Sequence, residues 1–229
     1  MSPKSSSAFW RGKKVLLTAG PTRELIDPVR FLTNASSGKF GVAIADAAHA
    51  RGASVTVVLG PCEVKPVKGV RVVPVTTALQ MRAEVLGLLA RADIVIASAA
   101  VGDWRVLNPK KQKIKRKPGL FRLTLVPNPD IIKEAARRRG KGARPILVGF
   151  ALETKNESGS ARRKLADKGL DLIVANGPAS LGSARVRFSI LTRHGAARAF
   201  PSMSKVSAAA AILKAVEAFA KEDDARRAS

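Results

Sequence analysis

The sequence contains no tyrosine, and aromatic residues make up only 4% of its 229 positions. It has a single cysteine, Cys62, so an internal disulfide and a cysteine-rich zinc site are excluded. The only histidines are His49 and His194. We therefore expect no metal ion held in a dedicated protein cage, and we predict ordinary surface positions for both histidines.

Acidic residues are also scarce, because 17 Asp and Glu stand against 41 Lys and Arg, which gives a formal net charge of +24. Such an excess raises nucleic acid as a partner. However, no basic stretch is interleaved with the aromatic residues that stack on exposed bases, and no helix-turn-helix or zinc-finger spacing occurs. A nucleic-acid-binding protein on a Rossmann scaffold remains an alternative class, but we expect no specific nucleic-acid binding.

Long apolar runs are missing too. No segment approaches the roughly 18 apolar residues of a membrane span, and the N-terminus (MSPKSSSAFWRGKK) lacks the apolar stretch of a signal peptide. We therefore expect a cytoplasmic protein with no membrane association.

The chain does contain a regular alternation of short apolar strands and helices. This alternation predicts an α/β fold, Rossmann-like and doubly wound, with a mostly parallel sheet and a small β flap or hairpin subregion. We predict strands at 15–19, 54–59, 70–75, 93–98, 121–126, 146–151 and 171–175, a hairpin of 186–192 with 196–200, and helices at 40–51, 79–91, 158–168 and 204–221. A further helix is expected to begin at Asn128-Pro129-Asp130, with the proline in its first turn.

These elements predict one domain over residues 13–221, with flexible tails at 1–12 and 222–229. Within it, a basic flap at 108–119 contains the run KKQKIKRK between proline and glycine residues. Like charges repel at this density, so we expect the flap to be mobile until a polyphosphate binds.

A long polar segment, TAGPTRELIDPVRFLTNASSGKFG at 18–41, separates the first strand from the first helix. Free backbone N–H groups, the Ser36 and Ser37 hydroxyls and the Lys39 ammonium could converge on an anion where that helix begins, although simple N-capping by the serines is the alternative. The segment matches neither G-x-G-x-x-G nor G-x-x-x-x-G-K-[ST]. A nicotinamide-dependent oxidoreductase is thus a weak alternative, and the lack of tyrosine also counts against it.

The segments AGPTRE, IDPVRF, Asn34 and SSGKFG, in one register, closely resemble phosphopantothenoylcysteine synthetase, the ligase that joins 4'-phosphopantothenate to cysteine in coenzyme A biosynthesis. The resemblance extends over nearly all of 13–221, through ASAAV-x-D, Lys113-Ile114-Lys115, Asn128–Ile131, Val148–Ala151 with Glu153 and Thr154, and Lys164. It departs from the family pattern at Gly102, Trp104 and Arg116, and in the hairpin before the last helix.

The resemblance implies a two-step reaction. The phosphopantothenate carboxylate attacks the α-phosphate of a nucleoside triphosphate, pyrophosphate leaves, and the cysteine amine then displaces the nucleotide monophosphate. It assigns Asn34 to the acyl-nucleotide intermediate and Lys113 to the triphosphate, with Lys115 assisting. It implies nucleotide contacts at Ala97, Ser98, Ala99, Asp103, Lys113, Pro129, Asp130, Ile131, Ile132, Phe150, Lys164 and Lys168. We assign phosphate binding to Ser36, Ser37, Gly38 and Lys39.

The Lys-x-Lys pattern at Lys113 resembles the bacterial branch of the family that uses CTP, and the ATP-dependent form of the same ligase is the alternative. Mg²⁺ is expected to bridge the phosphates. The resemblance further implies a homodimer, no flavin in this chain, and a separate decarboxylase that acts on the product.

Overall fold

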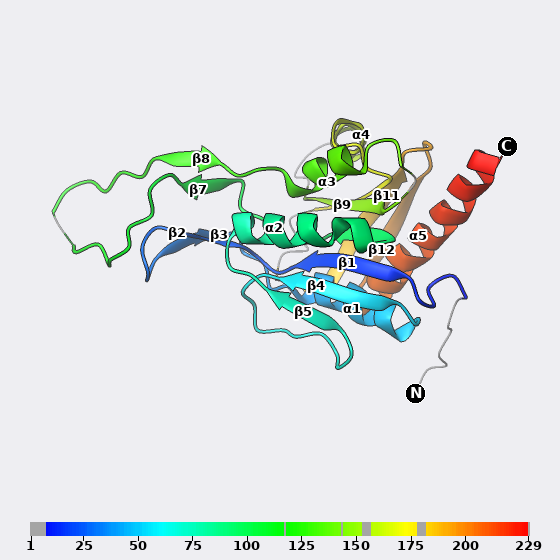
Figure 1. Cartoon of the computed structure of the whole chain (residues 1–229), viewed down its shortest axis with the longest axis horizontal. Helices are drawn as coiled ribbons and strands as arrows, with labels where there is room; N and C mark the ends of the chain where they lie inside the picture. The colour runs from blue at the N-terminus through cyan, green and yellow to red at the C-terminus, as the bar shows by residue number, and fades with distance from the viewer. Residues whose placement is uncertain (1–7, 117, 143, 153–156, 178–181, 229) are drawn as a thin grey trace.

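The structure, a computed structural model, describes residues 8–116, 118–142, 144–152, 157–177 and 182–228. An eight-stranded sheet forms its centre, in the order β12-β11-β10-β9-β6-β1-β4-β5 (Figure 1). The strands from β10 to β5 in that order are parallel, and β11 and β12 are antiparallel. The bounds are β1 (Lys14–Ala19), β4 (Ser54–Leu59), β5 (Arg71–Pro74), β6 (Ile94–Ala97), β9 (Ile146–Leu152), β10 (Leu172–Asn176), β11 (Arg185–Thr192) and β12 (Ala197–Ser204).

Numbered along the chain, the six parallel strands have the 3-2-1-4-5-6 order of the Rossmann fold. The predicted fold class is therefore confirmed. The parallel strands are nearly continuous apolar runs because helices cover both of their faces.

Two layers of helices cover the two faces of the sheet. Helices α1 (Lys39–Ala50) and α5 (Lys205–Ala228) pack on one face, where alternate β1 residues such as Val15 and Leu17 join their core. Leu16 points to the other face, which is covered by α2 (Ala78–Leu88), α3 (Ile131–Arg139) and α4 (Glu157–Asp167). A short 3₁₀ helix, η1 (Leu89–Arg91), follows α2. No helix within the described ranges is long and apolar enough to cross a membrane.

A second region projects from one end of this body (Figure 1). It consists of the hairpin of β2 (Arg23–Leu25) and β3 (Phe31–Thr33), together with β7 (Trp104–Val106), β8 (Leu125–Pro127) and the loop between the last two. We call residues 23–33 and 104–127 the arm. The sequence did not predict β2, β3 or β7, since three-residue strands carry little periodicity.

Several predicted boundaries differ from the structure. The strand expected at 121–126 is reduced to β8, because on the projecting arm no helical layer covers residues 121–124. Helix α3 begins at Ile131, so Pro129 precedes it, and Asp130 caps it by accepting a hydrogen bond from the Lys133 N–H at 3.1 Å. The predicted flexible tail at 1–12 is wrong at Trp10, which is completely buried in the core.

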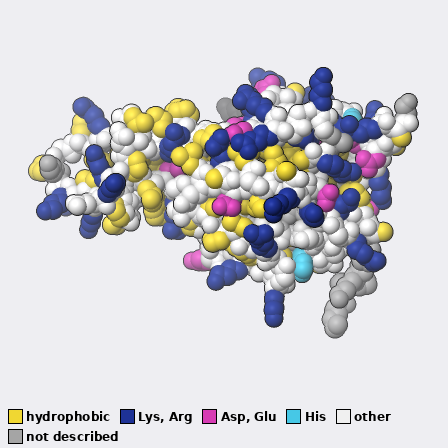
Figure 2. All heavy atoms as spheres, in the orientation of Figure 1, with side chains coloured by type: hydrophobic (Ala, Val, Ile, Leu, Met, Phe, Trp, Pro, Cys, Tyr) yellow, Lys and Arg dark blue, Asp and Glu magenta, His cyan; other side chains and the backbone are white. Residues whose placement is uncertain are grey.

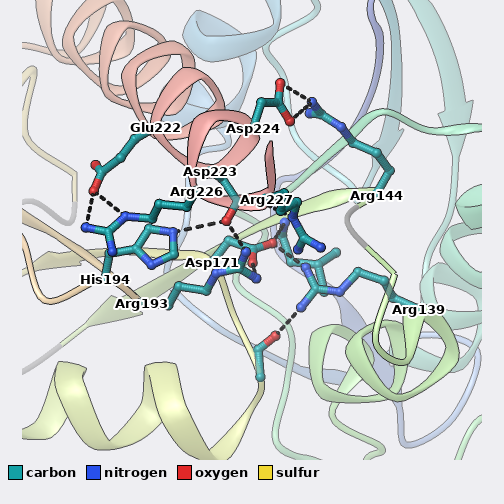
Figure 3. Close-up of polar contacts among 12 residues, drawn as sticks. Arg139, Arg144, Asp171, Arg193, His194, Glu222, Asp223, Asp224, Arg226 and Arg227 are labelled. Atoms are coloured by element: carbon teal, nitrogen blue, oxygen red, sulfur yellow. Dashed lines mark hydrogen bonds and ion pairs between the residues drawn. The ribbon is translucent and has the colours of Figure 1, made fainter. Parts of the chain in front are cut away.

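The predicted C-terminal tail is wrong as well, because α5 continues to Ala228. A cluster of ion pairs holds its last turns against the turn that follows β11 (Figure 3). The buried Asp223 carboxylate accepts from Arg193, from Arg227 Nε at 2.9 Å and pairs with His194 Nε2 at 3.0 Å. His194 is therefore half-buried and paired, where we had predicted an ordinary surface position.

The same cluster includes a second buried carboxylate, Asp171, just before β10. It accepts from the backbone N–H of Leu147 at 2.7 Å, from Arg193 Nη1 at 2.6 Å and from Arg139. Arg193 thus bridges Asp171 and Asp223, and it joins the sheet to the C-terminal helix.

Candidate active site

The order of the sheet reverses between β1 and β6, and a crevice is expected beyond the carboxyl ends of such strands. Two hydrogen bonds fix the strand ends here. The Ser98 hydroxyl donates to the Thr18 carbonyl at 2.7 Å, and the Ala99 N–H donates to Thr18 Oγ1 at 3.2 Å. Two pockets lie beyond these strand ends.

The first pocket encloses about 240 Å³ between the end of β6, helices α2 and α3, and Phe150 of β9. Apolar walls come from Met81 and Val85 of α2 and from Ile131 and Ile132 of α3. Of the residues to which we had assigned nucleotide contacts, it brings together Ala97, Ala99, Asp103, Pro129, Asp130, Ile131, Ile132, Phe150 and Lys168.

One cation of this pocket is already paired. Lys168 Nζ lies 2.9 Å from Asp130 Oδ2, and Lys168 follows directly after α4. Asp103 is exposed at the rim, and no hydrogen bond to its carboxylate occurs within the described part of the chain. The pocket therefore combines an apolar interior with charged groups at its edge, as small-molecule sites usually do.

The second pocket encloses about 170 Å³ and lies against the start of α1. It is lined by the 35–41 segment, by Ser98 to Ala100, by Asn176 and by Lys205. Phe150 lines both pockets, and its ring meets Phe40 edge-to-face with centroids 5.6 Å apart. Phe150 is therefore only partly a core residue, and it also forms the wall between the two pockets.

The serines beside this pocket do not cap α1. The N-cap residue is Gly38, with φ of 73°, and no side chain accepts a hydrogen bond from the first turn. A Cβ at Gly38 would lie 2.7 Å from Cys62 Sγ, so the turn needs glycine for space as well as for its φ angle. Burial raises the pKa of the Cys62 thiol, which keeps it neutral beside this turn. The capping alternative is thus not supported, and the first-turn N–H groups stay available to a ligand.

Asn34 joins the two halves of the site. Its Nδ2 donates to the carbonyls of Ala100, at 3.3 Å, and of Val101, at 3.0 Å. Both amide hydrogens are then used, and Oδ1 has no donor among the described residues. The side chain is exposed, so its amide oxygen can accept from a ligand at the junction of the strand end and the 35–41 segment.

The AGPTRE motif explains how the arm is attached at this point. Thr22 Oγ1 accepts from the Gly102 N–H at 2.9 Å, and the buried Glu24 carboxylate accepts from the Ala78 N–H at 2.9 Å. Ala78 is the first residue of α2, and a carboxylate at this end of the helix interacts favourably with the helix dipole. Thr77 and Gln80 form a capping box at the same end. These motif residues hold the arm against the rim of the first pocket.

The structure does not bring Lys113 to either pocket. It is exposed on the arm, as is Lys115. Between them, the Ile114 N–H donates to Asp27 Oδ2 at 3.1 Å, and the Ile114 carbonyl accepts from Arg30 Nη2 at 3.0 Å. The flap is therefore tied to the β2–β3 turn at this residue.

Asp27 is the centre of that attachment. It is 1% exposed, and its Oδ1 accepts from the N–H groups of Val29 and Arg30, each at 2.8 Å. Burial alone would raise the pKa of the Asp27 carboxyl, but the backbone donors and the Arg30 charge hold it below its ordinary value. The IDPVR motif thus has a structural explanation that the sequence alone did not provide.

Some of the other predicted site residues line a pocket, and others do not. Ser36, Ser37, Gly38 and Lys39 line the second pocket together, as does Ser98. Lys164 lies on α4, one turn before Lys168, and lines neither pocket. Glu153, Thr154 and Lys117 lie outside the described residues. Sequence reasoning missed Lys205, because no motif surrounds it and only the fold brings α5 beside α1.

The fold, with two pockets at its switch point, has the arrangement typical of α/β proteins that bind small molecules. The family model for the DNA/pantothenate metabolism flavoprotein C-terminal domain matches residues 10–219, and the chain belongs to this family. It is 41% identical over 228 residues to the coenzyme A biosynthesis bifunctional protein CoaBC of Bacillus subtilis, which covers 97% of this chain and 55% of the relative. The chain thus spans about half the length of that curated relative.

Solved structures show the same fold. The crystal structure of the C-terminal domain of a bifunctional CoaBC protein is 34% identical, covers 93% of this chain and 97% of its own, and superposes with a TM-score of 0.79. A Cab2 H337A mutant in complex with phosphopantothenate-cysteine has a TM-score of 0.76 at 18% identity, over 97% of this chain and 91% of its own. The second likeness is evidence of the fold alone.

Proposed function

We propose that this chain is a phosphopantothenate–cysteine ligase, which joins (R)-4'-phosphopantothenate to L-cysteine through an acyl-cytidylate and releases CMP and pyrophosphate. One observation carries the proposal: in a member of this family, two pockets share Phe150 and Ala99 in their linings, and Asn34 donates to the carbonyls of Ala100, which lines the second pocket, and Val101, which lines the first.

The pockets suit different parts of the reactants. The first, with apolar walls and Lys168 at its edge, is assigned to CTP. The second, with the open N-terminus of α1 and Lys39, is assigned to the phosphate of phosphopantothenate. The pantothenate carboxylate then lies near Asn34, facing the α-phosphate.

In the first step a carboxylate oxygen attacks the α-phosphorus, and the bond to the pyrophosphate oxygen breaks. In the second, the cysteine amine attacks the acyl carbon, CMP leaves, and the amine loses a proton. We assign to Asn34 Oδ1 the role of accepting a hydrogen bond from that amine. No enzyme nucleophile is required, so catalysis is mostly positioning and charge neutralisation.

Mg²⁺ is part of the proposal as a phosphate-bound ion. The described residues contain no group of three or more His, Cys, Asp or Glu side chains that could hold a metal ion. Asp103 is a carboxylate at the rim of the first pocket, and it suits an ion whose other oxygen ligands come from phosphates and water. Bound there, Mg²⁺ would neutralise charge on the triphosphate.

Lys113 needs a further step, since the arm holds it away from both pockets of its own chain. We assign it to the triphosphate of a site that it reaches either by closure of the arm or in a second copy of this chain. The arm also carries many exposed apolar side chains (Figure 2): Leu25, Val29, Phe31, Trp104, Leu107, Leu120, Phe121 and Leu125. Apolar surface concentrated on a projection supports a homodimer formed through the arm.

The reaction is tested by incubating the protein with phosphopantothenate, Mg²⁺ and either CTP or ATP, with and without cysteine. With CTP, we expect pyrophosphate whether or not cysteine is present. CMP and phosphopantothenoylcysteine should form only when cysteine is present. Release of pyrophosphate with ATP but not with CTP would support the ligase activity and would identify ATP as the nucleotide substrate. The absence of pyrophosphate with either nucleotide rejects the ligase.

The dimer is tested with Val29→Glu, a substitution at an exposed residue of the β2–β3 turn. We expect the wild type to sediment as a dimer, and the variant to dissociate because a carboxylate enters the apolar contact. Val67→Glu, at an exposed position on a loop of the body, is the matched control and should remain dimeric. A monomeric wild type contradicts the proposal.

A cytoplasmic location, and a decarboxylation step that consumes the product, complete the proposal. Both follow from the expected place of the reaction in coenzyme A biosynthesis.

A further inference from the structure

Lys205 is the first residue of α5 and lines the second pocket opposite the 36–41 segment. The fold brings it there from more than 160 positions along the chain, because α5 packs beside α1. Its backbone N–H is already used, since it donates to the Ala184 carbonyl at 3.3 Å. Only the side-chain ammonium is therefore available to a ligand.

Among the described residues that line this pocket, none is acidic, so none compensates the positive charge around the ammonium. Helix α1 has no acidic residue in its first turn and no side-chain cap, so the N–H groups of its first turn add a partial positive charge. Neither Lys39 nor Lys205 forms an ion pair with any described carboxylate. The pocket therefore presents donors from two helices and no acceptor of matching charge.

The charge of Lys205 is itself destabilised. Burial lowers the pKa of its ammonium, and the positive charge of Lys39 lowers it further. Two like charges that face one small pocket repel, and a dianion between them removes that repulsion. A phosphate group has the charge and the acceptor oxygens for this position.

We propose that Lys205, together with Lys39, selects the phosphorylated substrate, so that the ligase discriminates phosphopantothenate from pantothenate. The inference rests on the proposed function, and it assigns a specificity role to a residue outside the family motifs quoted above. Lys205 then contributes to binding of the substrate phosphate and not to the chemical steps.

The first test compares Lys205→Gln with the wild type on phosphopantothenate and on pantothenate. We expect kcat/KM for phosphopantothenate to fall about tenfold, as loss of one charge-assisted contact implies, while kcat/KM for pantothenate and KM for CTP stay unchanged. Lys205→Arg should keep most of the activity. Lys214→Gln, at an exposed position on the same helix, is the control and should behave as the wild type.

Calorimetry makes the result independent of turnover. Phosphopantothenate alone should bind Lys205→Gln about tenfold more weakly than the wild type, with binding of pantothenate unchanged and the melting temperature preserved. Equal losses for both compounds, or no loss for phosphopantothenate, overturn the inference. A wild type that binds phosphopantothenate but releases no pyrophosphate rejects the proposed ligase, and the binding data still decide the role of Lys205.

Discussion

Asn34 shows how one side chain can be both structural and available to a ligand. Its amide nitrogen is occupied by the carbonyls of Ala100 and Val101, and its amide oxygen is open. The sequence predicted its importance but could not predict this division of roles, because the two carbonyls lie more than 60 residues away.

Asn34→Asp should therefore fail for a geometric reason. A carboxylate would replace the donor and would face two carbonyl oxygens, so it should turn away or repel the acyl-phosphate. We expect turnover to fall by at least about 100-fold, with the melting temperature within a few degrees of the wild type. Asn108→Asp, on an exposed part of the arm, is the control. A near-normal rate in Asn34→Asp would remove the residue from its proposed role.

Lys113→Gln tests the exposed lysine of the flap. We expect pyrophosphate release to fall by roughly 10- to 100-fold, since a charge that neutralises the triphosphate is lost. Thermal stability should not change because the side chain has no partner among the described residues. Lys111→Gln, in the same loop, should have little effect; equal losses in the two variants would indicate a general effect of flap charge.

At the scale of elements, the arm depends on Asp27. This buried carboxylate arranges the β2–β3 turn and also binds the flap at Ile114. Lys113 and Lys115 therefore flank a fixed point. We had expected a mobile flap without ligand, and its attachment at Ile114 predicts that this residue stays ordered without one.

Asp27→Asn tests this attachment. The new amide can keep the bonds to Val29 and Arg30, but its NH₂ group would face the Ile114 N–H, donor against donor. We expect faster hydrogen exchange at the Ile114 amide and about a tenfold loss of pyrophosphate release, because Lys113 is no longer positioned. Asp46→Asn is the control. The Asp46 carboxylate accepts a hydrogen bond from the Val67 N–H at 2.9 Å, away from the arm, and its replacement should leave both measurements unchanged.

The sequence predicted the elements of the body well for a physical reason. Buried strands such as β4 are continuous apolar runs, and helices such as α2 begin at a capping box, so local patterns determine them. The arm follows different rules. Its short strands are held by contacts such as Thr22 to Gly102 and Asp27 to Ile114, which join distant parts of the chain and leave no periodic pattern.

The residues of the candidate site also fall into those that local sequence patterns predict and those that only the fold brings together. Residues close to a strand end or a helix start, such as Ala97 and Ser36, could be predicted because the fold rule places those points at the crevice. Lys205 could not, since it reaches the pocket only through the packing of two helices. The sequence also could not show that Phe150 stands between two cavities.

At the scale of the whole molecule, the ion-pair cluster sets the response to acid. Burial alone would raise the pKa of Asp223 from its ordinary 3.8, but hydrogen bonds from Arg227 and Arg193, with His194, hold it far below that value. A carboxyl with a depressed pKa in the folded state stabilises the fold above its unfolded pKa, and this contribution is lost as the pH falls below about 4.

Asp223→Asn should therefore destabilise the protein at neutral pH and flatten part of its acid transition. Loss of a charge that is 8% exposed, paired with two guanidinium groups and in contact with His194, is expected to cost about 3 kcal/mol, which corresponds to roughly 6–12 °C in the melting temperature. Asp224→Asn is the matched control, because the Asp224 carboxylate is 59% exposed and, among the described residues, forms an ion pair only with Arg144. Melting curves between pH 7 and pH 3 that do not differ between the two variants contradict this account.

The shared wall of Phe150 has a consequence for the fate of the intermediate. An acyl-nucleotide is a mixed anhydride, and water destroys it if it escapes. With one aromatic ring between the two cavities, the anhydride formed by the proposed reaction spans both and need not diffuse to meet the amine. Hydrolytic leakage is then limited by how long cysteine takes to arrive, so the yield of product per nucleotide consumed should rise with the cysteine concentration.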